Sequence, residues 1–224
     1  MGDGLAGRGA ITIWQDVRPE AREDFFAWHN GEHIPERVGI PGFLRGRRYG
    51  ALAGAPEFFT LYETAGPEVH TSAAYFERLN HPTPQTRRVA PMMINNVRSL
   101  CRVEWSRGAV GGGLMATLRF EGEQGNQLLP LLTERLPRLL ERPGVVGAHL
   151  CLADKSASSV KTEEKSSRPT AARVPGWVVL VEGGASRESL ERAVAELLDE
   201  RSLAAAGATD VQCGIYVLQV SLSR

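Results

Sequence analysis

The chain has 224 residues, and its 26 lysines and arginines balance its 26 aspartates and glutamates, so the formal net charge at pH 7 is zero. This balance gives no electrostatic basis for binding nucleic acid or an anionic membrane. No apolar run reaches about 18 residues, so we expect no membrane-spanning helix, and residues 1–9 lack the apolar centre of a signal peptide. Three widely spaced cysteines in apolar surroundings are typical of buried, reduced thiols, which favours a cytoplasmic protein.

The first half of the chain alternates between strand and helix patterns. Ile11, Ile13 and Val17 recur on one side of residues 10–17, which predicts a strand. Pro19 then begins a helix, because proline is favoured in the first helical turn. The remaining elements of this half are strands at 43–49, 58–64 and 97–105, a helix at 68–80, and a short helix from Pro84 that Thr83 caps. The order β-α-β-β-α-β is that of a ferredoxin-like unit.

The same order recurs after a glycine-rich junction at residues 108–113. A leucine-rich helix at 126–142 leads through Pro143-Gly144 into a strand, just as Pro41-Gly42 leads into a strand in the first half. The other elements of this half are strands at 114–120, 145–150, 177–181 and 214–222 and a helix at 186–198. The repeated junction between helix and strand indicates two copies of one unit.

Each unit would have one sheet face covered by helices and one face bare, and packing the two bare faces together buries both. We therefore predict an α+β fold of two tandem ferredoxin-like modules packed sheet to sheet as a pseudo-dimeric α/β barrel. The modules would span residues 10–107 and 114–224, after a flexible N-terminus at 1–9. Residues 154–175 contain no aromatic residue and little apolar surface, so we expect a mobile surface loop there with nothing to bury.

The most unusual stretch lies in the first predicted helix. His29 and His33 fall one helical turn apart on one face, as do Glu32 and Glu36. A stripe that faces a core accepts imidazoles and carboxylates only when they have partners. Pro35 cannot donate to the carbonyl four residues back, so we expect the helix to kink or end near His33. The two histidines and two glutamates are the candidate catalytic residues.

Aromatic and basic residues near this stretch are candidates for binding a substrate. Arg48 alternates with Arg45 and Arg47 along one strand, so it should face the opposite side of the sheet. An arginine there could bind an anionic or carbonyl group, although pairing with acids is the commoner role. The candidate substrate-binding residues are Trp28, Arg37, Arg48, Tyr49, Tyr62 and Trp14.

Several motifs of the first half resemble a known superfamily. Glu32-His33-Ile34-Pro35-Glu36-Arg37, followed by Pro41-Gly42-Phe43 and Arg47-Arg48-Tyr49, resembles the His-x-Pro signature of EthD-like and muconolactone isomerase-like members of the dimeric α/β-barrel superfamily. Asn80-His81-Pro82-Thr83 with Thr86-Arg87-Arg88 is similar to a segment of bacterial members without an assigned role. The resemblance implies a pocket between sheet and helices into which His33 points. It implies no particular reaction, because fold does not fix function.

Two further interpretations concern the histidines. His29, Glu32 and His33 match the H-x-x-E-H zinc pattern in form, but the pattern needs an unbroken helix, which Gly31 and Pro35 oppose. No third ligand is evident, so we predict no metal. For His33 two roles stay open: a histidine satisfied by a carboxylate or carbonyl at a helix end, or a pocket-facing acid/base group.

The function that we expect is a cofactor-independent enzyme of isomerase or lyase type, acting on a small, largely apolar metabolite that is aromatic or contains a carbonyl group. His33 would act as general acid and base, Glu32 or Glu36 would orient it, and an arginine or tyrosine would polarise the substrate oxygen. The alternatives are a non-catalytic small-molecule-binding or scaffold protein of the same fold, a cofactor-free oxygenase, and a haem-binding protein. We expect no cofactor and no nucleic-acid or membrane partner. A homodimer beyond the internal pseudo-dimer is compatible with the sequence.

Overall fold

Eight strands close into one antiparallel barrel within residues 4–123 and 127–224, the part of the chain that the computed structural model describes. The order around the barrel is β1-β3-β2-β8-β5-β7-β6-β4. The strands are β1 (Gly9–Val17), β2 (Phe43–Ala53), β3 (Phe58–Thr64), β4 (Met93–Gly108), β5 (Leu114–Glu121), β6 (Val145–Ala153), β7 (Trp177–Gly183) and β8 (Thr209–Ser223). The predicted α+β fold of ferredoxin-like halves in a pseudo-dimeric barrel is confirmed.

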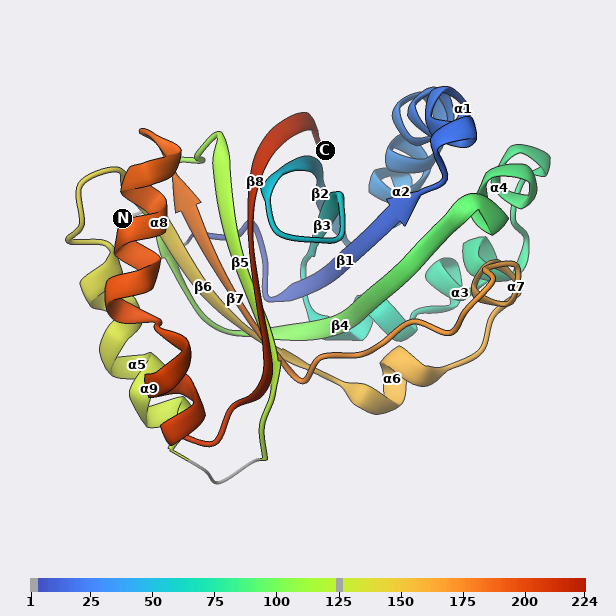
Figure 1. The fold of residues 1–224 in the computed structure, drawn as a ribbon. Helices are drawn as coiled ribbons and strands as arrows, with labels where there is room; N and C mark the ends of the chain where they lie inside the picture. The colour runs from blue at the N-terminus through green and yellow to red at the C-terminus, as the bar shows by residue number, and fades with distance from the viewer. Residues whose placement is uncertain (1–3, 124–126) are drawn as a thin grey trace.

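Helices cover the outside of the barrel on two opposite sides (Figure 1). On the first-half side they are η1 (Pro19–Ala21), α1 (Arg22–Trp28), η2 (His29–His33), α2 (Ile34–Gly39), η3 (Pro67–Thr71), α3 (Ala73–Asn80), α4 (Pro84–Val89) and η4 (Ala90–Met92). On the other side are α5 (Leu128–Leu139), α8 (Arg187–Leu197) and α9 (Glu200–Ala205). Asn126, where the sequence predicts that the leucine-rich helix begins, lies outside the described residues.

Strand side chains alternate between the barrel interior and the helix-facing outside. The interior core joins both halves: Trp14, Tyr49 and Phe59 from the first half pack with Met115 and Tyr216 from the second, and all five are 0% exposed. The halves also pair along two seams, β2 with β8 and β4 with β6. The bare sheet faces are thus buried against each other, and the helix-facing sides remain for separate cores in each half.

The two helix-to-strand junctions confirm the internal repeat. Gly42 has φ of +89° and Gly144 has φ of +85°, a left-handed conformation that side chains rarely adopt. Each glycine follows a proline and precedes the second strand of its half. The Pro-Gly pair therefore sets the same turn in both halves, as the repeated sequence indicates.

The connection between β6 and β7 departs from the expectation of a loop with nothing to bury. It forms α6 (Lys155–Ser159) and α7 (Glu163–Ser166), and Figure 1 shows this orange segment leaving the second half to lie beside α3 on the first-half side. Ser158, Thr162 and Glu164 are buried there. Composition misled because the buried groups are polar, which an apolar count does not register: Ser158 accepts from the amide of Leu100 and Glu164 pairs with Arg37, while Thr162 caps α7.

The described part of the N-terminus also packs against the barrel. Leu5 is 3% exposed, and the amide of Ala6 donates to the Glu63 carboxylate at 2.7 Å, so residues 4–8 do not behave as the free tail that the sequence suggests. Residues 1–3 lie outside the described part.

Of the cysteines, Cys101 and Cys151 are buried as expected, but Cys213 is exposed. Within the described residues, the helices are all too short or too polar to cross a membrane.

Candidate functional site

A widened helical turn carries the two histidines. Residues His29–His33 form a π-helical turn between α1 and α2, in which the amide of Ile34 donates to the carbonyl of His29. The sequence predicted that Pro35 would kink or end the helix. Instead the helix continues through a wider turn, because a proline lacks the amide hydrogen and its ring would crowd the carbonyl four residues back. The turn directs both histidines toward the sheet.

Both imidazoles are buried and stacked beside each other. His29 is 3% exposed and His33 is 5% exposed, and their ring centroids lie 5.5 Å apart. Trp28 packs on His33 with ring centroids 4.3 Å apart. Burial lowers the pKa of each histidine well below its usual value, and nearby cations lower both further: Arg37 for His33, and Arg48 for His29. Both imidazoles are therefore neutral at physiological pH.

The two glutamates lie apart from the histidines. Glu32 accepts hydrogen bonds from the Thr83 and Thr86 hydroxyls, and the Thr86 hydroxyl in turn accepts one from the Trp28 indole at 3.0 Å. Glu36 pairs with Arg37 at 2.9 Å. Among the described hydrogen bonds, neither carboxylate contacts an imidazole. Orientation of His33 by Glu32 or Glu36, which the sequence suggested, therefore has no support in these contacts.

Arg48 holds the first histidine from the sheet side. Its guanidinium donates to Nδ1 of His29 at 3.1 Å and to the Asn30 side chain at 2.6 Å, which makes that ring nitrogen an acceptor. The same guanidinium lies 4.9 Å from the Phe26 ring centroid and donates to Gln219 of β8 at 3.1 Å. Arg48 and Arg47 lie on opposite faces of the sheet, as strand alternation predicts: Arg48 faces the helices, and Arg47 faces the barrel interior and pairs with Glu182 at 3.0 Å.

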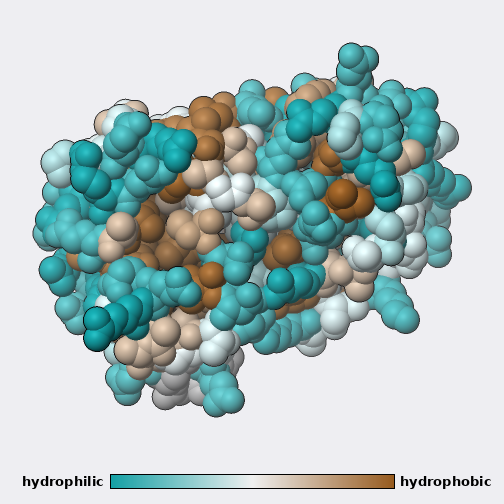
Figure 2. Space-filling view, in the orientation of Figure 1, coloured by the Kyte–Doolittle hydropathy of each residue, from teal (hydrophilic) through white to brown (hydrophobic). Residues whose placement is uncertain are grey.

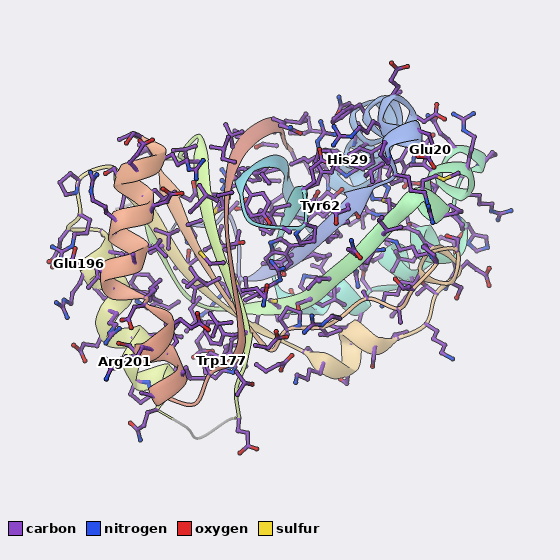
Figure 3. All side chains as sticks on the ribbon, viewed as in Figure 1. Glu20, His29, Tyr62, Trp177, Glu196 and Arg201 are labelled. Carbon is purple, nitrogen blue, oxygen red and sulfur yellow. The ribbon has the colours of Figure 1, made fainter. Side chains whose placement is uncertain are left out.

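The structure divides the aromatic candidates between the two faces of the sheet. Tyr62 faces the helices with His33, at 6.4 Å between ring centroids, and Figure 3 shows Tyr62 and His29 together on the first-half side. Trp14 and Tyr49 instead pack inside the barrel, where the Trp14 indole donates to Thr117 at 3.2 Å. Because a strand presents alternate residues to opposite faces, these two cannot join the histidines.

A buried ionic network borders the histidines, and the α6–α7 segment supplies part of it. Arg37, 2% exposed, pairs with Glu164 of α7, which is 5% exposed. Arg168 lies 3.7 Å from the same carboxylate and donates to the Asn96 side chain at 2.8 Å. Sequence reasoning missed Glu164 and Arg168, because a polar segment distant in sequence gives no local sign of such pairing.

Strand β4 adds a second arginine that the sequence analysis missed. Arg98 is 6% exposed and donates to the Tyr75 hydroxyl at 2.7 Å, which places it on the helix-facing side. The available signal was that Arg98 shares a strand face with the apolar Leu100, since an arginine on a face that packs on helices points to a buried partner or a ligand.

Several polar atoms of this region lack a hydrogen-bond partner among the described residues. They are Nδ1 of His33, the Tyr62 hydroxyl, the Thr60 hydroxyl, Nη1 of Arg98 and Nε of Arg168. They belong to the helix-facing side of the first sheet, to the π-helical turn that carries His33, and to the segment after α7 that carries Arg168. Buried polar groups are normally satisfied, so these five atoms are the ones in this region with free capacity to bind water or a ligand.

Two large cavities lie outside this arrangement, and neither is lined by His29 or His33. One of about 460 Å³ lies between α2 and α3, and Glu36 in its lining pairs with Arg37 of the buried network. The other, of about 470 Å³, lies in the second half between α8, α9 and strands β5 and β8. Its lining includes Leu118, Val194 and Cys213. Figure 2 shows apolar surface gathered toward the left of the view, over the second half.

The zinc-like pattern does not converge on one point. Nδ1 of His29 accepts from Arg48, and the Glu32 carboxylate points to Thr83 and Thr86. Among residues 4–123 and 127–224, no three His, Cys, Asp or Glu side chains cluster as metal ligands would. A guanidinium at hydrogen-bond distance from an imidazole nitrogen is also incompatible with a cation at that nitrogen.

Comparison of sequences gives no relatives: no protein-family model matches the chain, and no curated protein matches it. Comparison with solved structures gives proteins of similar fold. An anthrone oxidase-like protein aligns with a TM-score of 0.62 at 10% identity, over 96% of this chain and 92% of that chain. A candidate monooxygenase from Lactobacillus acidophilus has a TM-score of 0.57 at 8% identity, over 96% of each chain.

A candidate chlorite dismutase is similar over the same extent, with a TM-score of 0.57 at 10% identity and 96% of each chain covered. Identities this low establish the shared fold and leave the reaction open. The coverage of both chains means that the whole two-half barrel is shared, rather than one module. The chain therefore has the fold of the dimeric α+β barrel proteins, with both ferredoxin-like halves in one polypeptide.

Proposed function

We propose that this protein is an enzyme of isomerase or lyase type that needs no cofactor and moves a proton on a small, largely apolar carbonyl-containing or aromatic molecule. The molecule would lie between the first sheet and the helices α1, α2 and α3. The observation that supports this most directly is the pair of unpartnered atoms, Nδ1 of His33 and the Tyr62 hydroxyl, which face the same buried region.

His33 has the properties of a general base. Its imidazole is neutral because burial lowers its pKa, so it can accept a proton at physiological pH. Its Nδ1 is unpaired and Trp28 packs on its ring, which fixes the ring without occupying that nitrogen. A proton taken from a carbon next to a carbonyl could then be returned at another carbon by the same imidazolium.

Tyr62 is suited to polarise the substrate oxygen. Burial raises the pKa of its phenol, so the hydroxyl stays protonated and available as a donor. A donor directed at the developing oxyanion stabilises the transition state more than the ground state. The sequence left this role to an arginine or a tyrosine, and of the two candidate tyrosines Tyr49 lies inside the barrel. Trp28 and Phe25 would supply the apolar wall.

Exchange of carbon-bound hydrogen in D₂O tests the proposal without knowledge of the natural substrate. Small aromatic ketones and β-keto esters are incubated with the protein, and deuterium incorporation is followed by NMR. We expect catalysed exchange that His33→Asn lowers by about 10²-fold or more, the range typical of general base catalysis. His81→Asn is the matched control, because His81 is exposed.

Equal exchange rates in wild type and His33→Asn would overturn the role of His33. Shifts of the His33 NMR signals on ligand addition without any exchange would instead identify a non-catalytic binding protein. Consumption of oxygen together with the ketone would identify a cofactor-free oxygenase and contradict the isomerase or lyase reaction. Each outcome is read from the same samples, so the three functions are separated in one experiment.

A further inference from the structure

Positive charge is concentrated between the first sheet and its helices. The guanidinium groups of Arg37, Arg48 and Arg98 are each 6% exposed or less. The side chain of Arg168 is 9% exposed. In the described salt bridges, Glu164 pairs with Arg37 and Arg168, but no carboxylate pairs with Arg48 or Arg98. A buried charge without a counter-ion is costly, so this region favours an anion that the chain itself does not supply.

Arg48 and Arg98, which have no carboxylate partner in the described salt bridges, differ in their free hydrogen-bond donors. Arg48 is held by neutral partners: it donates through Nε to Gln219 and through Nη1 to His29 and Asn30, and it lies over a phenylalanine ring. Arg98 donates to the Tyr75 hydroxyl through Nη2, while its Nη1 has no partner among the described residues. Among the described residues, the buried donors without a partner therefore include one of Arg98 and none of Arg48.

Arg168 presents a second free donor to the same region. Its Nη1 donates to Asn96, two residues before Arg98 on β4, while its Nε lacks a partner among the described residues. The two free guanidinium donors lie on the side of the sheet that carries His33 and Tyr62. Ordered water could satisfy these donors as hydrogen-bond partners, but water does not neutralise the charge.

We propose that Arg98 and Arg168 form an anion-binding subsite, and that the molecule held beside His33 is a small organic acid that presents a carboxylate to them. Guanidinium groups suit this ligand because their planar N–H donors match the two carboxylate oxygens and their hydrogen bonds are charge-assisted. The inference rests on the proposed function and names its substrate class. The rest of the substrate would extend over Trp28 toward His33 and Tyr62.

The subsite needs both halves of the chain. Arg98 comes from β4 of the first half, whereas Arg168 comes from the segment that follows α7 in the second half. Glu164 of the same segment pairs with Arg37, and the amide of Arg98 donates to the carbonyl of Arg173 at 2.8 Å. These contacts hold the segment against the first half. Arg168 is therefore already in place beside the first sheet, and a substrate carboxylate would bind to it and to Arg98 together.

Binding of benzoate, benzamide and their 4-bromo forms tests the inference. Calorimetric titration should show that benzoate binds at least about tenfold more tightly than the neutral benzamide, the size expected for a hydrogen bond to a charged group. Arg98→Gln and Arg168→Gln should weaken benzoate at least about tenfold and leave benzamide unchanged. Arg88→Gln is the matched control, since the Arg88 side chain is 63% exposed. A wild-type crystal soaked in 4-bromobenzoate should place the carboxylate at Arg98 and Arg168, which requires no variant to fold.

Equal binding of benzoate and benzamide, benzoate binding that Arg98→Gln leaves unchanged, or a carboxylate located elsewhere would overturn the subsite. The proposed function fails separately. If benzamide binds and shifts the His33 NMR signals while benzoate binds no better, the His33 site stands and the anionic substrate class is wrong. If neither molecule binds nor shifts those signals, and water alone fills the region in the crystal, both proposals are wrong.

Discussion

The two halves of this barrel can be compared residue by residue, because their strands pair in the same register. In the first half, Ile13 lies opposite Thr60 of β3 and Arg98 of β4. At the matching place in the second half, Leu118 lies opposite Val179 of β7 and Cys213 of β8. One ladder step away, Tyr62 faces Ile11 just as Val181 faces Ala116. The same backbone thus carries a polar surface in one half and an apolar surface in the other.

The connections between the second and third strands of each half differ in the same way. Residues 54–57 join β2 to β3, and Ala53 and Gly54 border the open apolar cavity of the second half. Residues 154–176 join β6 to β7 and place Glu164 over the first half. The polar half is therefore covered and the apolar half is left open. Side chains and one connection, rather than the scaffold, decide which half has the chemistry of a site.

A large effect should come from the buried ion pair of the covered half. Glu164→Gln removes the buried counter-ion that Arg37 and Arg168 share and leaves Arg37 paired only with the less buried Glu36, and we expect a loss of about 3 kcal/mol in the free energy of unfolding. Glu163→Gln is the matched control, because Glu163 is exposed in the same helix. Urea unfolding of both variants measures the difference. If the two variants are equally stable, the α7 segment does not pack on the first half as described.

A core substitution in the apolar half should be costly without touching the candidate site. Leu136 is 0% exposed in α5, so Leu136→Ala should lose about 2–5 kcal/mol through the cavity that it opens. Leu129→Ala, in the same helix, is the control. It should lower the free energy of unfolding far less, because Leu129 is 37% exposed. Thermal melts give the stabilities, and the histidine NMR signals should be unchanged in both. A shift of the His33 signals in Leu136→Ala would show that the halves are coupled.

The buried histidines should make stability depend on pH. Their folded-state pKa values are lowered, so below about pH 6.5 the unfolded chain binds more protons than the folded one and stability falls as pH falls. Each neutral histidine should contribute a slope of about 1.4 kcal/mol per pH unit. Unfolding by urea between pH 7.5 and 5.5 measures it. His33→Asn should reduce the slope, whereas His81→Asn, at an exposed position, should leave it unchanged; the reverse result would contradict the burial of His33.

The smallest effect should distinguish the two faces of the first sheet. Tyr49 and Tyr62 both have hydroxyls without partners among the described residues, but only Tyr62 faces the helices. Tyr49→Phe should therefore change stability by less than about 1 kcal/mol and leave ligand binding unchanged. Tyr62→Phe should be equally mild in stability and weaken binding of a carbonyl ligand. Calorimetry and thermal melts on the two variants decide it, and weaker binding in Tyr49→Phe would place the site inside the barrel.

Local sequence patterns determined the scaffold and the position of the histidine pair. Alternating apolar residues gave the strands, and the two Pro-Gly junctions gave the repeat, because turn geometry at Gly42 and Gly144 depends on neighbouring residues alone. Helical spacing likewise placed His29 beside His33, and alternation placed Arg48 on the face opposite Arg47. The same alternation, followed further, would have set Tyr49 on the face opposite Arg48.

Tertiary structure alone decided the rest of the site. Glu164 lies 127 residues from its partner Arg37, and a pairing over that separation leaves no periodic signal in either segment. The segment that carries Glu164 looks unstructured by composition, because its buried groups are charged and hydroxylated rather than apolar. The segment folds against donors of the first half that have no other partner there among the described residues, such as the Leu100 amide, and against the charge of Arg37. Such complementarity exists only once the barrel has brought the two surfaces together.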